Sequence, residues 1–347
     1  MATAERTSQT WWRQLVATYA KPQLGRSIWQ IINSFVPYVG LWFLLVWSLE
    51  VSYWLTLLLA VIASGFLVRI FIILHDCSHG SFFRSRRANA IIGFLAGIVT
   101  FTPYHQWRAQ HARHHVTSGD LDRRGTGDIW TLTVQEYLES TRLKRIAYRL
   151  TRNPVFLFVI GPLYMFLIHQ RFPSPAMKKR DRMFVHLTNL CLVAVATSLS
   201  LLIGFKTYVL IQLPLLTISS AFGLWLFYVQ HQFDGVYWKR KDDWSYADAA
   251  LKGSSYYKLP GMLQWFSGNI GFHHLHHLSA SIPNYNLQRC HEENPEFGNV
   301  TTLTLRSSLK SLSLRLWDEE SGRLIGYREL RRIKRGLAAM PADASPS

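Results

Sequence analysis

Four long apolar stretches limit the folds that are open to this chain. They cover about residues 28–49, 52–74, 184–204 and 207–230. Each stretch is long enough to cross the roughly 30 Å hydrocarbon core of a bilayer as an α-helix. Only Glu50 and Val51 separate the first stretch from the second, and only Phe205 and Lys206 separate the third from the fourth. The sequence therefore predicts an all-α membrane protein with four transmembrane helices in two hairpins.

Basic residues predict how these helices are oriented. The chain has a formal net charge of +17 although 49% of its residues are hydrophobic. Arginines and lysines flank the outer ends of both hairpins, whereas the turns carry only Glu50 and Lys206. By the positive-inside rule, both termini and the long 75–183 connection are expected on the cytoplasmic side. Because a membrane location accounts for the charge, we expect no nucleic-acid partner.

Two shorter apolar runs, 89–101 and 155–168, complicate the topology. Each has about 13 or 14 residues, which is short for a span and suits a helix on the membrane surface. If either run crossed the bilayer, the histidine clusters described next would face opposite compartments. We therefore expect both runs at the cytoplasmic surface, on the condition that those clusters form one site.

Ten of the fourteen histidines fall in four clusters. These are HDCSH at 75–79, HARHH at 111–115, His231 after the fourth stretch, and HHLHH at 273–277. In a helix, spacings of three and four residues place side chains on one face. Neutral imidazole is a common ligand of iron, zinc and copper. Eight or nine such ligands are too many for one ion and suit two, so the clusters predict a histidine-rich di-metal site.

Other polar residues are ambiguous. Asp76 could orient a metal-binding histidine by accepting its second ring N–H, or it could serve only the end of the helix. His274 points away from the shared face of its cluster and is expected at the surface or behind a ligand. The remaining histidines stand alone and are expected to have no role in the site, with His105 the least certain of them: His105, His169, His186 and His291.

The order of these features predicts three parts. Residues 1–27 are expected to form a cytoplasmic N-terminal segment, 28–305 a membrane domain, and 306–347 a basic cytoplasmic tail. Within the membrane domain, residues 75–183 and 231–305 are expected to fold as a cytoplasmic helical cap that carries the di-metal site. A metal site between a membrane base and a polar cap suits a substrate with an apolar tail and a polar head.

The order H-x-x-x-H, H-x-x-H-H and a distal H-x-x-H-H resembles the histidine boxes of the integral-membrane fatty acid desaturases. The segments around these boxes are more similar to those of the acyl-lipid enzymes of bacteria and plastids than to those of the acyl-CoA enzymes. They are HDCSHGSFF, WRAQHARHH, VQHQFD and GNIGFHHLHHLS. The resemblance covers roughly residues 30–295. It implies an enzyme of the bacterial inner membrane that introduces a cis double bond into a fatty acyl lipid, with two non-haem irons and dioxygen as oxidant.

Transferred by position, the resemblance implies nine metal ligands. They are His75, His79, His111, His114, His115, His231, His273, His276 and His277. Acyl-CoA desaturases have an Asn one turn before the ligand that matches His231, whereas this chain has Phe227 there. Asn269 or a water could take over that role.

The resemblance also implies an external source of electrons. No haem-binding HPGG sequence occurs in the chain, so a separate ferredoxin or cytochrome b5-type donor, with its reductase, is expected. The basic segment 306–335 then has two open interpretations. It could be attracted to anionic lipid headgroups, or it could form a docking surface for an acidic electron donor.

Three other functions stay open at this point. A related membrane hydroxylase or ketolase of lipids, alkanes or carotenoids would have similar histidine boxes but would form an oxygenated product. A metal transporter would place ionisable groups inside its spans, and these spans hold little besides Arg69 and His186. A metal-binding scaffold without catalytic activity would not consume oxygen when supplied with a reductant.

Overall fold

The computed structural model describes residues 11–338, and most of them are helical. Four long helices correspond to the four apolar stretches. They are α3 (Leu24–Val51), α4 (Tyr53–His79), α10 (Lys179–Ile203) and α11 (Phe205–His231). By length and composition, all four could cross a membrane. The prediction of four apolar helices is confirmed.

The outer surface of α3 is apolar, and the N-terminal half of its inner face is polar. Ser27, Gln30 and Ser34 are buried, whereas Trp29 and Phe43 are 64% and 74% exposed. A soluble helix would place these residues the other way round. Small polar residues inside and large apolar residues outside are typical of helices that pack together in lipid.

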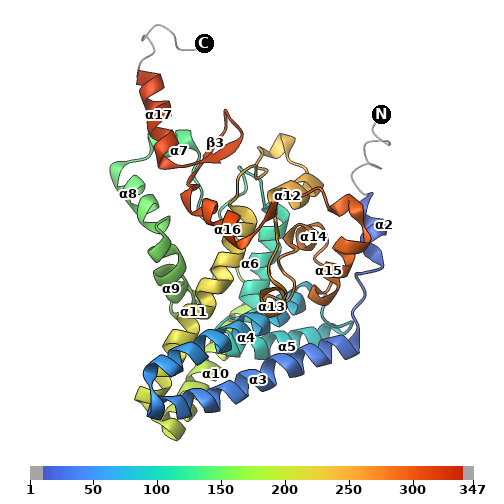
Figure 1. The fold of residues 1–347 in the computed structure, drawn as a ribbon, viewed down its shortest axis with the longest axis vertical. Coiled ribbons are helices and arrows are strands. Elements are labelled where there is room, and N and C mark those ends of the chain that lie inside the picture. Colours follow the sequence, from blue (N-terminus) through green and yellow to red (C-terminus); the bar gives the residue numbers. More distant parts are fainter. Residues whose placement is uncertain (1–10, 339–347) are drawn as a thin grey trace.

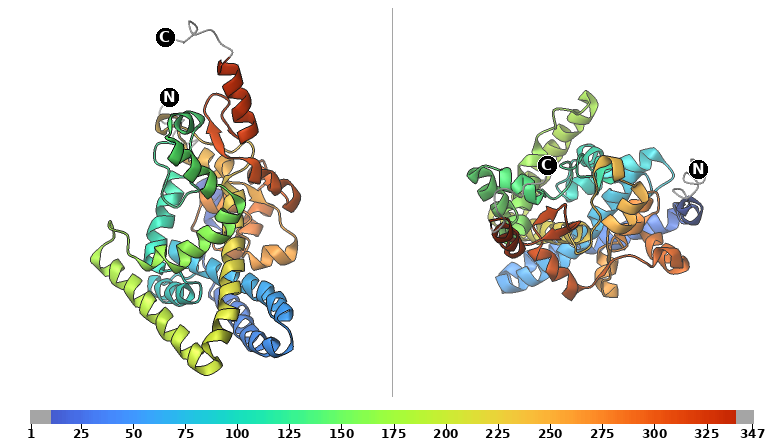
Figure 2. Two further views of the ribbon diagram at one scale, coloured as in Figure 1. Left: turned by 90° about the vertical axis from the view of Figure 1, so that its left-hand side faces the viewer. Right: turned by 90° about the horizontal axis from the view of Figure 1, so that it is seen from above.

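Helix α4 lies at the centre of the apolar helices, in contact with both α3 and α11, while α10 packs on α11. Ala60 and Ala63 are buried beside Ile211 and Leu215, because their short side chains let the two helices approach closely. Figure 2 shows α10 diverging from α11 beyond their shared turn, and the apolar segment of α10 has the smallest buried share among the four helices.

The two turns that join these helices lie at one end of the molecule, and the cap lies at the other (Figure 1). The cap contains α6 (Tyr104–Thr117), α12 (Tyr246–Gly253), α14 (His273–Leu278) and α15 (Asn284–Glu293). The described ends of the chain, in α2 (Trp12–Ala17) and α17 (Tyr327–Ala338), also lie toward the cap. The segments 1–27 and 306–347 of the sequence analysis extend into residues 1–10 and 339–347, which are outside the described residues.

The two shorter apolar runs are both helical. The run 89–101 lies in α5 (Arg86–Val99), which packs on α4. The run 155–168 forms the π-helix η1 (Phe156–Ile160) and α9 (Gly161–Leu167), followed by η2 (His169–Arg171). Together with α8 (Arg142–Thr151), these elements make a pair bent by 68° that could amount to a fifth span. The expected surface position of both runs stays a prediction.

Short elements complete the cap. They are α7 (Val134–Glu139), η3 (Lys241–Asp243), α13 (Gly261–Phe266), η4 (Pro295–Phe297), α16 (Leu305–Ser308) and η5 (Leu309–Ser313). Strand β1 (Tyr256–Tyr257) pairs in parallel with β2 (Thr302–Leu303), and β3 (Leu316–Asp318) pairs antiparallel with β4 (Arg323–Ile325). The basic segment at the C-terminal end is therefore folded onto the cap, and its Leu316 and Ile325 are fully buried.

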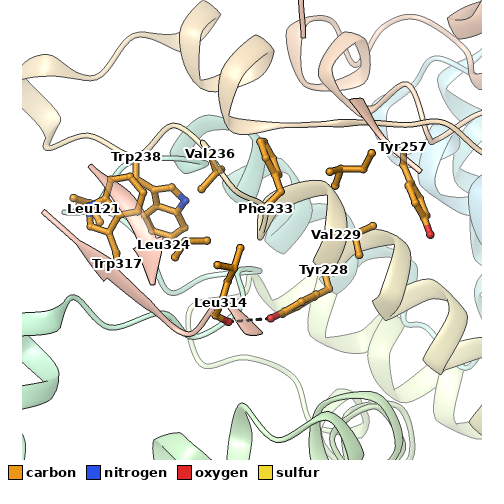
Figure 3. Close-up of a cluster of buried hydrophobic side chains, with 11 residues drawn as sticks. Leu121, Tyr228, Val229, Phe233, Val236, Trp238, Tyr257, Leu314, Trp317 and Leu324 are labelled. Atoms are coloured by element: carbon orange, nitrogen blue, oxygen red, sulfur yellow. Dashed lines mark hydrogen bonds between the residues drawn. The ribbon is translucent and has the colours of Figure 1, made fainter. Parts of the chain in front are cut away.

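A hydrophobic cluster holds the cap end of α11 in place (Figure 3). Tyr228, Val229 and Phe233 contribute to it from α11 and the residues just beyond, and Trp317 contributes from β3. The Tyr228 hydroxyl donates to the backbone oxygens of Ser311 at 2.9 Å and Leu314 at 3.4 Å. The end of α11, where His231 lies, is thereby fixed against the C-terminal segment.

Candidate metal centre

Four helices bring the predicted histidines together. His75 and His79 lie on the last turns of α4, which ends where Gly80 adopts a left-handed conformation with φ of 72°. Helix α6 carries the histidines of the second cluster, α14 those of the fourth, and His231 is the last residue of α11. All of these helix segments meet where the apolar helices join the cap.

The histidines form two groups. In the first group, one ring nitrogen of each member lies within 4.8 Å of those of the others: His75, His79, His111, His115 and His276. The second group, under the same limit, consists of His114, His231 and His277. His273 adjoins the second group, since its Nε2 lies 2.9 Å from Nε2 of His231. The structure therefore brings all nine predicted residues together.

Several ring nitrogens in the two groups lack a hydrogen-bond partner. Among the described residues, Nε2 of His75, His79 and His277 is buried without a hydrogen-bond partner. Buried polar atoms are nearly always satisfied by protein or water. Convergent, unpartnered imidazole nitrogens are therefore what a metal site requires, and the donor set fits nitrogen-binding transition metals.

Burial keeps the imidazoles of the cap neutral. It lowers the pKa of His111 and His115 well below the usual value of 6.5, and the neighbouring histidines lower it further. The same cause lowers the pKa of His276 and His277 on α14. A neutral imidazole keeps the lone pair that a metal needs, so these residues are ready to bind an ion at neutral pH.

A carboxylate supports His75 from behind. Nδ1 of His75 lies 3.1 Å from Oδ1 of Asp76, so Nε2 faces the first group. The other oxygen of Asp76 accepts hydrogen bonds from Asn284, from its backbone N at 2.7 Å and its Nδ2 at 2.8 Å. Asn269 donates its side-chain amide to the backbone oxygen of Asn284 at 3.2 Å, and it is therefore linked to His75 through Asn284 and Asp76.

The second group has supports that the sequence analysis missed. Nδ1 of His114 lies 2.6 Å from Oδ1 of Asp128, and Nδ1 of His231 lies 3.3 Å from the backbone oxygen of Gly253. Asp128 follows the second histidine cluster in the glycine-containing loop RRGTGDIW. The position of this carboxylate, in a glycine-containing loop soon after a histidine cluster, could have identified Asp128 as a candidate support.

Phe227 occupies the position where acyl-CoA desaturases have an Asn. Its ring lies 5.1 Å from the rings of both His114 and His231, measured between centroids. The polar atom beside His231 is instead the Gly253 oxygen. The side-chain amide of Asn269 donates to the backbone oxygen of Asn284, and its expected role in place of the Asn stays a prediction.

The remaining histidines lie outside both groups. His274 is fully buried, with Nε2 3.2 Å from Nδ1 of His291, and burial lowers its pKa to about 3. Of its two expected places, the surface is wrong, because the ring is enclosed beside Tyr256 of β1 and His291 of α15; a place behind a ligand stays a prediction. His105 pairs with Asp181 at 3.7 Å, and His169 lies in η2.

Comparison with known proteins agrees with this geometry. The family model of the fatty acid desaturases matches residues 52–302. A protein of Bacillus subtilis named fatty acid desaturase is 50% identical over 329 residues, which are 95% of this chain and 93% of that protein.

Two relatives from Synechocystis are more distant. One, named sn-1 acyl-lipid omega-3 desaturase (ferredoxin), is 31% identical over 64% of this chain and 62% of that protein. Another, named sn-1 oleoyl-lipid 12-desaturase, is 27% identical over 64% of this chain and 63% of that protein. The family match and the Bacillus relative both span the four histidine clusters, and the chain belongs to the fatty acid desaturase family.

Proposed function

We propose that this protein is a membrane acyl-lipid desaturase with two non-haem irons, which introduces a cis double bond into a fatty acyl chain. The observation that carries the proposal is the pair of buried histidine groups with convergent ring nitrogens, in which Nε2 of His75, His79 and His277 has no hydrogen-bond partner. In the overall reaction, a CH2–CH2 pair loses two hydrogens to become CH=CH. Dioxygen accepts them with two donor electrons and two protons, and two waters form.

The two groups would each hold one iron. His75, His79, His111, His115 and His276 would bind the first, and His114, His231, His273 and His277 would bind the second. When bound, the irons supply the oxidising power that an unactivated methylene requires. The chain's own task is to hold the acyl chain and exclude water.

Residues behind the ligands keep them in position. Asp76 and Asp128 accept the Nδ1–H of His75 and His114, which fixes the tautomer and leaves Nε2 for the metal. Trp107 stacks on His111, with ring centroids 4.3 Å apart, and covers one face of that ring. These contacts let the site form before a metal binds.

We place the site and both termini on the cytoplasmic side of a bacterial inner membrane. The positive-inside rule supports this orientation, and the described ends of the chain lie toward the cap, at the same end of the molecule as the site. Single cysteines at positions 50, 125, 206 and 300, introduced after replacement of the native Cys77, Cys191 and Cys290, test it in sealed inside-out vesicles. Positions 125 and 300 should react with an impermeant reagent and 50 and 206 should not; the reverse pattern would contradict the orientation.

We further propose that electrons come from a separate ferredoxin or cytochrome b5-type donor and its reductase. One Synechocystis relative carries ferredoxin in its name, which supports the first choice. Purified protein with reduced ferredoxin should consume oxygen only when acyl lipid is present.

Product analysis decides the reaction type. The chain is expressed in a host with saturated and monounsaturated lipids, and new double bonds are located by mass spectrometry. Cis-unsaturated products that disappear in the His111→Ala variant support the proposal. An oxygenated product would instead identify a membrane hydroxylase or ketolase. If the lipids do not change, the proposed activity is contradicted.

A further inference from the structure

A cleft of about 550 Å³ lies beside the metal centre and contains none of its nine histidines. Its lining includes Arg69, Lys258, Trp265, Asn269, Asn284 and Glu292. These residues come from α4, α13, α15 and the segments next to β1 and α14. The lining mixes charged, amide and aromatic groups, which suits a polar ligand better than an acyl chain.

Arg69 is a buried cation without an anion. Its side chain is within the apolar part of α4 and the residue is only 7% exposed. Its Nε donates to Asn33 at 3.4 Å, its Nη1 donates to the backbone oxygen of Trp265, and its guanidinium lies 3.9 Å from the centre of the Trp265 ring. Among the described residues, no carboxylate pairs with it. An ionisable group inside a span is costly and usually marks a functional site.

Two more charges face the same cleft. Lys258 is exposed and has no ion pair within residues 11–338. Glu292 is also exposed, and its carboxylate accepts a hydrogen bond from Gln288 at 2.8 Å. Two cations and one carboxylate leave a single net positive charge. This balance favours an anion with one negative charge over an anion with two.

One wall of the cleft has the character of a membrane interface. Helix α13, which packs on α4 and forms one wall, exposes Met262 by 71%, Leu263 by 39% and Trp265 by 38%. Exposed apolar residues and tryptophan on a short helix are typical of the membrane interface. Arg69 precedes His75 by six residues, which is about 9 Å along the helix axis.

The wall of the cleft is shared with the support of the metal centre. Asn284 lines the cleft and donates to Asp76, which lies 3.1 Å from His75. A ligand in the cleft would thus lie two side chains away from the first histidine group. This is a suitable place to anchor the polar end of a substrate whose acyl chain is to reach that group.

We propose that this cleft binds the phosphodiester of a glycerophospholipid substrate, with Arg69 and Lys258 as its cationic partners. The proposal rests on the proposed desaturase function and names the substrate class of the same site. Glu292 makes the site selective, because it repels the second negative charge of phosphatidate or of free phosphate. A galactolipid with the same acyl chains lacks the phosphate and would bind weakly.

Measurement of lipid binding tests the proposal without requiring catalytic activity. The full-length protein is purified in detergent and its binding of phosphatidylglycerol and of a galactolipid is compared by native mass spectrometry. We expect Lys258→Gln to weaken phosphatidylglycerol binding about fivefold, as the loss of one lysine near a headgroup predicts, and to leave galactolipid binding unchanged. The matched control is Lys144→Gln, which removes an exposed lysine on α8, away from the cleft.

Two further variants sharpen the test. Glu292→Gln should increase phosphatidate binding relative to phosphatidylglycerol. Arg69→Gln should abolish the preference for phosphatidylglycerol, with its melting temperature measured in parallel. Because Arg69 also packs on Trp265, the exposed Lys258→Gln variant decides the case if Arg69→Gln does not fold.

Three outcomes would overturn the inference. They are equal binding of phosphatidylglycerol and galactolipid by the unaltered protein, equal loss in Lys258→Gln and Lys144→Gln, and displacement of the lipid by millimolar inorganic phosphate. Selective lipid binding without formation of double bonds would contradict the proposed desaturase function but support the headgroup site. The failure of one proposal can therefore be told from the failure of the other.

Discussion

Nδ1 of His114 lies 2.6 Å from a carboxylate oxygen of Asp128, and the opposite ring nitrogen of His114 lies 3.2 Å from Nε2 of His231. The carboxylate therefore decides which nitrogen of His114 faces the second histidine group. Asp76 has the same relationship with His75 in the first group. Each group thus has one histidine whose tautomer is fixed by an aspartate.

The Asp128→Asn variant should bind metal more weakly. An amide can still contact Nδ1 but no longer carries the charge that raises the basicity of the ligand, and losses of this type are typically about 10- to 100-fold in metal affinity. Iron content and activity are measured on purified protein. The control is Asp122→Asn, which removes an exposed ion pair with Arg240 in the same loop. Equal iron content in the two variants would contradict a supporting role for Asp128.

Replacement of one histidine in any of the four clusters should abolish activity. We expect His75→Ala, His111→Ala, His231→Ala and His273→Ala each to lose desaturation and to lower bound iron, because each removes a nitrogen from the interior of a group. His169→Ala should retain most of the activity, since His169 lies in η2 outside both groups. An active His111→Ala enzyme would disprove the di-metal site.

The apolar helices and the histidine groups could be predicted because both depend on local patterns. A continuous apolar run predicts a span by its length alone, and α3, α4, α10 and α11 match the predicted ranges closely. Likewise, spacings of three and four residues place His111, His114 and His115 on one face of α6 regardless of the rest of the fold. The division of the histidines into two groups, with His111 and His115 in one and His114 in the other, depends on tertiary packing and does not follow from spacing.

The supports behind the ligands could not be predicted in this way. Asn284 reaches Asp76 across 208 positions of sequence, and Gly253 reaches His231 only because the chain returns through α12. These contacts depend on how the cap folds, which local spacing does not encode. The C-terminal segment was predicted as a tail because of its basic charge, and its strands were not predicted. In these strands, Leu316 pairs with Ile325 inside the cap.

Metal should stabilise the folded protein. A ligand that binds only the native state at about 1,000 times its dissociation constant adds about 4 kcal/mol to the free energy of unfolding. Removal of iron by a chelator should therefore lower the melting temperature measured by intrinsic fluorescence, and iron added back should restore it. His111→Ala protein should respond less to both treatments. A melting temperature that does not change on chelation of iron-loaded protein would show that no structural metal is held.

Arg152 should be required to hold the cap end of α11. It is only 2% exposed, and its Nη2 donates to Oε1 of Gln232 at 2.8 Å and to the backbone oxygen of Leu314 at 3.1 Å. Arg152→Met removes these two bonds and a longer one to the Tyr228 hydroxyl and leaves buried acceptors with fewer partners, which we expect to cost about 2–4 kcal/mol of stability. The control Arg142→Met changes an exposed arginine on α8. Similar melting temperatures for the two variants would show that the Arg152 bonds contribute little.

The basic face of α17 should serve the electron donor if that surface is a docking site. Arg331, Arg332 and Arg335 are exposed on this helix, and clustered positive charge accelerates association with an acidic protein in a way that salt weakens. Replacing all three by Glu should raise the apparent KM for reduced ferredoxin and remove its salt dependence, with iron content and membrane insertion unchanged. The control reverses Lys144, Arg142 and Arg145 on α8. If donor kinetics and their salt dependence are the same in the α17 variant and the unaltered protein, the donor docks elsewhere on the cap.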